Sequence, residues 1–109
     1  MEYYKEIKKA VNIPVINTDG FQRGSLIRKG IEEGYFDGVA IARPLIAPNE
    51  LPKVLELGKD LPDRPCSFCK RCLINAIANP LGCYDLRRFS SHDEMIEEVM
   101  TVFDPSHFV

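Results

Sequence analysis

The sequence lacks three features that would assign the chain to common functional classes. It has no apolar run long enough to cross a membrane. It has no basic run interleaved with aromatic residues, and its formal net charge of −2 gives no support for nucleic-acid binding. Its first residues, 1–6, are charged where a signal peptide would be apolar. We therefore expect a cytoplasmic protein that binds neither nucleic acid nor membrane.

Histidine is also scarce, which removes the commonest general base. The chain has two histidines, His92 and His107. His92 lies at the start of a predicted helix, where we expect it to face solvent, and His107 is near the end of the chain. Neither is placed beside a convincing nucleophile, so we assign no catalytic residue.

The apolar pattern of the first 60 residues predicts alternating helices and strands. A helix end over 3–11 is followed by a strand over 12–17, a helix over 24–33, a strand over 36–44 and a helix over 50–58. This order is typical of a βαβα unit with two parallel strands. Two parallel strands do not form a stable isolated sheet. We therefore expect the missing strands to come from a parent chain or from another subunit.

The second predicted strand has no polar alternation. Val39, Ala40 and Ile41 are all apolar, so we expect both faces of this strand to be buried, as in a covered parallel sheet. Arg43 follows directly at the strand end, where α/β folds bind ligands. Pro44 can begin a helical turn over 44–48.

The ends of the two strands predict an anion site. The segments 18–21 and 42–45 close consecutive parallel strands and should lie side by side. Gly20 allows close approach of the backbone, whose amides can donate to a phosphate. Arg43 adds a charge and a two-pronged donor, whereas Asp19 opposes the anion by like charge.

Four cysteines follow a polar, proline-rich connector over 60–65. Cys66, Cys69 and Cys72 are each separated by two residues, and Cys83 follows after ten more. In a cytosolic chain this set favours metal ligands or free thiols over disulfides. Four thiolates suit an iron–sulfur cluster or zinc, and the spacing alone does not decide between them. The intervening cations, 70 and 71, would favour the thiolate form and offset the charge of a cluster.

The last segment predicts a capped helix. Ser91 and Glu94 have the spacing of a capping box. The following helix would end near 104–105 and carry an apolar face made of Met95, Ile96, Val99, Met100 and Phe103. We interpret this face as a packing surface, because glutamates rather than lysines occupy the opposite side.

In their order and spacing these segments resemble the C-terminal part of the NADH:flavin oxidoreductase family, the relatives of old yellow enzyme. The matching segments are 13–16, 19–21, 37–45 and the helix from 50. The cysteine segments, 64–72 and 79–83, resemble the subgroup that includes trimethylamine dehydrogenase and dienoyl-CoA reductase types. In this chain Asp19 and Ala42 stand where those relatives usually have glycine, and the gap before Cys83 is slightly shorter.

The resemblance implies a fold and a set of cofactors. The fold class would be α/β: the C-terminal βαβα portion of a TIM (β/α)8 barrel, followed by a cysteine-rich segment and a C-terminal helix. Implied FMN-binding residues are Gly20, Phe21, Ala42 and Arg43, around the phosphate, and implied metal ligands are Cys66, Cys69, Cys72 and Cys83. A 4Fe-4S cluster is implied ahead of zinc, and NAD(P)H would be the reductant of the parent enzyme.

The predicted organisation has three parts. Residues 1–60 would be the last two β/α units of a flavin-binding barrel, 61–89 the cysteine-rich segment, and 90–109 the C-terminal helix and tail. The resemblance implies a fragment of an FMN-dependent, ene-reductase-like oxidoreductase that acts on a small-molecule substrate in the full-length protein and is inactive alone. The alternative is a small zinc or iron–sulfur module without enzymatic activity.

Overall fold

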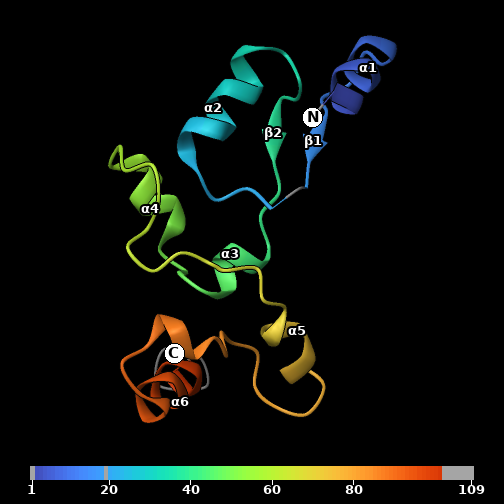
Figure 1. Cartoon of the computed structure of the whole chain (residues 1–109). Helices are drawn as coiled ribbons and strands as arrows, with labels where there is room; N and C mark the ends of the chain where they lie inside the picture. The colour runs from blue at the N-terminus through green and yellow to red at the C-terminus, as the bar shows by residue number, and fades with distance from the viewer. Residues whose placement is uncertain (1, 19, 102–109) are drawn as a thin grey trace, which may run out of the picture.

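The computed structural model describes residues 2–18 and 20–101 as helices joined to a two-stranded parallel sheet (Figure 1). Its elements in chain order are α1 (Glu2–Ala10), β1 (Ile16–Asn17), α2 (Gly24–Glu32), β2 (Gly38–Val39), α3 (Arg43–Ile46), α4 (Leu51–Glu56), α5 (Arg71–Asn75), the 3₁₀ helix η1 (Leu86–Arg88) and α6 (His92–Thr101). The βαβα order predicted for the first 60 residues is confirmed. The molecule is a partial α/β structure, because the two strands of the described part do not close a barrel.

The two strands pair in parallel through the α2 crossover. Ile16 lies opposite Gly38, and Asn17 lies opposite Val39. Beyond this register, the Ala40 amide donates to the carbonyl oxygen of Asn17 at 2.9 Å. The carboxyl ends of β1 and β2 therefore meet at one edge of the sheet, next to α3 (Figure 1).

The prediction that the second strand is buried on both faces was wrong. Val39 and Ile41 are half-buried and Ala40 is exposed, while Ile16 on the neighbouring strand is 57% exposed. The physical reason is the size of the sheet. Within residues 2–18 and 20–101 only β1 and β2 pair, so no further strand or helix layer covers the second face.

A small aromatic core lies between α2 and the sheet. Phe21 and Phe36 are 2% and 1% exposed, and their rings meet edge to face with centroids 5.3 Å apart. Gly30 of α2 lies directly on Phe36, since a Cβ at this position would be only 2.1 Å from its ring. This packing holds the loop after β1, which carries Phe21, against the strand that leads to Arg43.

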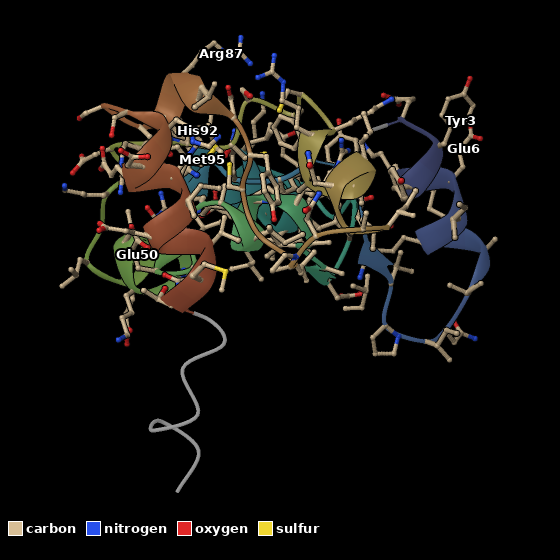
Figure 2. The ribbon with its side chains drawn as sticks, turned by 90° about the horizontal axis from the view of Figure 1, so that it is seen from below. Tyr3, Glu6, Glu50, Arg87, His92 and Met95 are labelled. Carbon is tan, nitrogen blue, oxygen red and sulfur yellow. The ribbon has the colours of Figure 1, made fainter. Side chains whose placement is uncertain are left out.

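The C-terminal segment packs through α6. Met95 and Val99 are each 4% exposed, which confirms them as packing residues, whereas Ile96 and Met100 are 39% and 52% exposed. Figure 2 shows Met95 and His92 of α6 at the end of the molecule opposite Tyr3 and Glu6 of α1. The predicted members of this region at 103–105 lie outside the described residues.

The predicted capping box is present with a shift of one residue. The Ser91 hydroxyl accepts a hydrogen bond from the Glu94 amide at 3.2 Å. The Glu94 carboxylate in turn accepts from the amide of Ser90 at 2.7 Å. His92 is exposed, as predicted, and His107 lies outside the described residues. In the described part, no helix combines the length and the apolar character that a membrane span requires.

Candidate functional site: a strand-end cavity beside four thiols

A cavity of about 200 Å³ opens where β1 and β2 end. The loop after β1 and the segment from β2 into α3 line it together, with one residue from the cysteine segment. The lining residues are Thr18, Gly20, Phe21, Ala40, Ile41, Ala42, Arg43, Pro44 and Phe68. All four residues implied for cofactor binding, Gly20, Phe21, Ala42 and Arg43, are thus brought together. Asp19, implied to oppose the anion, lies outside the described residues.

The backbone conformation at position 20 favours glycine. Gly20 has φ +56°, a left-handed conformation that side chains disfavour. A Cβ on Gly20 would also lie 3.5 Å from the ring of Phe68, so the loop runs close to the cysteine segment. The turn after β1 therefore brings its backbone to the cavity wall.

Arg43 supplies the charge of this cavity. It is half-buried at the start of α3, and it is the charged residue among those that line the cavity in the described part of the chain. Its guanidinium carbon lies 5.3 Å from the centroid of the Phe68 ring. Pro44, which follows, is buried in the first turn of this short helix, which begins one residue before the predicted turn over 44–48. Within the described residues, the cavity therefore carries one cationic side chain in a lining that is otherwise uncharged.

The four cysteines line a second cavity that shares a wall with the first. Cys66, Cys69, Cys72 and Cys83 are free thiols, and all are half-buried. Arg43 and Phe68 line this cavity as well as the strand-end cavity. The thiol cavity has a volume of about 10 Å³, which is at the lower limit for holding one water molecule.

The thiols differ in their electrostatic surroundings. Burial raises the pKa of the Cys66 thiol, and nearby Cys83 and Cys72 act in the same direction. Burial acts to raise the pKa of Cys69 too, but the nearby Arg71 amide and Ser67 hydroxyl leave it below its usual value. Of the two intervening cations, Arg71 contributes through its charge to the lowered pKa of Cys69, after the Arg71 amide and Ser67, and at Cys66 burial dominates.

The four thiols have the chemistry of metal ligands, but their positions in this structure do not form a metal site. Four thiols on one cavity match the ligand chemistry of zinc and of iron–sulfur clusters. However, no group of three or more histidine, cysteine or acidic side chains within residues 2–18 and 20–101 is arranged to hold a metal ion. Loading would therefore require the thiols to draw together.

Sequence reasoning missed the contacts that dock the cysteine segment onto the strand ends. The side chain of Gln22 donates to the Cys66 carbonyl oxygen at 2.8 Å and accepts from the Cys66 amide at 2.9 Å. Gln22 directly follows the predicted site residue Phe21, but no spacing pattern links it to a cysteine 44 residues later. We call this pair of hydrogen bonds the Gln22 clamp.

A second missed feature is a buried carboxylate behind the cysteines. Asp85 is 1% exposed and accepts hydrogen bonds from the Ser67 hydroxyl and from Arg87 Nε at 2.9 Å. The Arg87 hydrogen bonds and the Ser67 hydroxyl hold the pKa of Asp85 well below its usual value, although burial opposes them. Ser67 also contacts Cys69, so this network anchors the loop that carries the thiols.

Comparisons with known proteins give curated relatives but no match to a family model or to a solved structure. The chain is 36% identical over 94 residues to an NADH oxidase of Thermoanaerobacter brockii, covering 73% of this chain and 14% of that protein. It is 37% identical over 76 residues to a multifunctional alkene reductase/demethylase OYE of Caballeronia cordobensis, covering 67% of this chain and 11% of that protein. It is 35% identical over 78 residues to a bilirubin reductase of Mediterraneibacter gnavus, covering 72% of this chain and 12% of that protein.

These relatives agree in the class of chemistry that their names describe, since each is named as an oxidoreductase. The chain spans between 11% and 14% of their lengths, so it corresponds to a small part of each. The resemblance stated from the sequence is confirmed: the chain belongs to the old yellow enzyme-like family of oxidoreductases.

Proposed function

We propose that this chain provides the FMN phosphate-binding end of an FMN-dependent, ene-reductase-like NAD(P)H:flavin oxidoreductase. The observation that carries the proposal is the strand-end cavity, which gathers Gly20, Phe21, Ala42 and Arg43. Backbone amides of the two loops would donate to the phosphate, and the Arg43 guanidinium would pair with its charge. FMN, when bound, supplies hydride transfer between NAD(P)H and a small-molecule substrate.

The size of the cavity limits what this chain does by itself. Sites for drug-sized ligands usually have volumes of about 300–1,000 Å³, whereas the strand-end cavity has about 200 Å³. It has room for the phosphate end of FMN, and the walls around the flavin ring would come from the other strands of the parent chain or subunit. We therefore expect the isolated chain to bind FMN weakly and to reduce no enone when NADH is added.

The cysteine set would hold a metal, and we propose a 4Fe-4S cluster ahead of zinc. The ligands would be Cys66, Cys69, Cys72 and Cys83, since all four line one cavity. A cluster, when bound, supplies one-electron transfer. The same observation supports the second candidate function, a metal module without enzymatic activity. Anaerobic purification followed by iron and zinc analysis separates a cluster from zinc, because colourless protein with one zinc per chain would contradict the cluster.

The phosphate role of Arg43 is tested by titrating FMN into the full chain and following its amide NMR signals. Losing one charge-assisted interaction of about 1.5–3 kcal/mol should weaken FMN binding of R43L by about ten- to 150-fold. R28L is the matched control, because Arg28 is an exposed arginine on α2, away from the cavity lining. Equal FMN affinity in R43L and the unmodified chain would refute the proposed site.

A further inference from the structure

Phe68 occupies the wall between the strand-end cavity and the thiol cavity. It lines both, as does Arg43. It lies between two cysteines of the cysteine segment and has φ +56°, a conformation that is costly for a residue with a side chain. The Phe68 amide also donates to the Cys66 sulfur at 3.3 Å. The backbone is thus turned in the direction that brings this ring to the strand ends.

The ring fixes the position of the Arg43 charge. The guanidinium carbon lies 5.3 Å from the ring centroid, within the range of a cation–π contact. A guanidinium held over an aromatic face keeps the N–H donors at its edge available for an anion. Cε1 and Cζ at the edge of the ring lie against Gly20, where an added Cβ would be 3.5 and 3.6 Å away. Phe68 therefore contacts both the charged and the backbone wall of the proposed phosphate site.

The Gln22 clamp holds this arrangement in register. Its two hydrogen bonds fix Cys66, two residues before Phe68, to the loop that follows β1. That loop also carries Gly20 and Phe21, which line the strand-end cavity. A shift of the cysteine loop would therefore move the aromatic ring relative to Arg43.

We propose that Phe68 is a positioning residue for Arg43 and that the Gln22 clamp sets the ring in place. The anion affinity of the strand-end cavity then depends on how the cysteine loop is docked. The predicted effect on anion affinity rests on the proposed phosphate role of Arg43. The predicted placement of the Arg43 side chain by Phe68 can be tested in the chain without ligand.

The test is NMR of the full chain with inorganic phosphate as the probe. In F68L, without ligand, the Arg43 Hδ and Hε signals should lose the ring-current shift that the aromatic face imposes. Its phosphate affinity should fall about two- to fivefold, the loss expected for a partly exposed cation–π contact. F68Y keeps the ring and should retain the Arg43 shifts and the phosphate affinity of the unmodified chain.

The matched control is F89L. Phe89 also lies near guanidinium groups, with its ring centroid 5.4 Å from the guanidinium carbon of Arg64 and of Arg88, but it is absent from the lining of the strand-end cavity. F89L should leave the Arg43 signals and the phosphate affinity unchanged. If F68L and F89L weaken phosphate binding equally, the loss reflects stability alone and the positioning role is refuted.

A double-mutant cycle tests the clamp. Q22A should weaken phosphate binding in the same direction as F68L, and the double variant should lose no more than F68L alone, because both changes act through one ring. If the fold-losses in phosphate affinity of Q22A and F68L multiply in the double variant, the coupling between the clamp and the ring is refuted. Unchanged Arg43 signals in F68L would refute the positioning role. R43L that binds phosphate as well as the unmodified chain would instead refute the proposed function, whatever the Arg43 signals show in F68L.

Discussion

The Asp85 network gives the sharpest stability prediction, because a buried carboxylate anchors the loop that carries the thiols. In the variant D85N the charge is lost, and one acceptor oxygen becomes an NH₂ group that faces the Arg87 donors. Asp85 accepts from Arg87 Nε at 2.9 Å, from Arg87 Nη2 at 3.1 Å and from the Arg87 amide at 3.2 Å, as well as from the Ser67 hydroxyl. The variant therefore disturbs several bonds at one buried position.

The magnitude follows from the exposure of each partner. The Ser67 bond to the buried carboxylate should contribute about 1.5–2 kcal/mol as a charge-assisted hydrogen bond. The Arg87 side chain is 69% exposed, so water screens this ion pair to less than about 1 kcal/mol. Together these contributions amount to about 1.5–3 kcal/mol, so we expect D85N to lower the free energy of unfolding by that amount near neutral pH. Urea unfolding followed by circular dichroism measures this difference.

The pH dependence of the same variant tests the cause. Because Arg87 and Ser67 hold the pKa of folded Asp85 below the usual 3.8, the folded state binds fewer protons than the unfolded state as the pH falls below about 4. The stability that Asp85 contributes is therefore complete above that range and is lost as the pH falls further. The difference between D85N and the unmodified chain should shrink from pH 5 to pH 2. A difference independent of pH would refute the electrostatic reasoning.

The matched control for this measurement is D63N. Asp63 pairs with Lys59 at 3.3 Å, and its side chain is 88% exposed. An exposed pair of this kind contributes little, so D63N should change the free energy of unfolding by less than about 0.5 kcal/mol. A loss in D63N as large as in D85N would show that burial does not explain the effect.

Three further predictions concern packing, capping and the thiols. G30A should lower the free energy of unfolding by about 1–3 kcal/mol in urea unfolding, since its Cβ would meet the Phe36 ring at 2.1 Å; unchanged stability would contradict this packing. S91A should cost about 1 kcal/mol in thermal unfolding, because the Glu94 amide loses its cap; no loss would show that the cap is dispensable. C72S should lower the bound iron per chain measured after anaerobic purification, and unchanged iron would exclude Cys72 as a ligand.

The sequence predicted the composition of the strand-end cavity but not what lies against it. Gly20 and Arg43 could be placed together because the carboxyl ends of consecutive parallel strands always meet at one edge. All four cysteines line one cavity, and the short spacing of the first three already indicated that they would lie near each other, but the described residues are not arranged to hold a metal ion. By contrast, the Gln22 clamp depends on the approach of segments 44 residues apart, and no periodic pattern signals such a contact.

The error in the burial of the second strand has a related cause. Val39, Ala40 and Ile41 have the composition of a covered strand, yet within the described residues no layer covers them. The apolar composition of a segment indicates that it is suited to a buried position. The exposed fraction of its side chains depends on which neighbouring strands and helices are present. The proposed parent strands would supply those neighbours.

The Gln22 clamp also implies an order of folding. Closing a loop of 44 residues costs about 3 kcal/mol of chain entropy, more than its two hydrogen bonds contribute at about 1 kcal/mol each. The clamp therefore forms only after β1, α2 and β2 have assembled and fixed the position of Gln22. A newly synthesised chain exposes its four thiols throughout that interval, so the rate at which the sheet forms would set the time available for inserting the proposed metal.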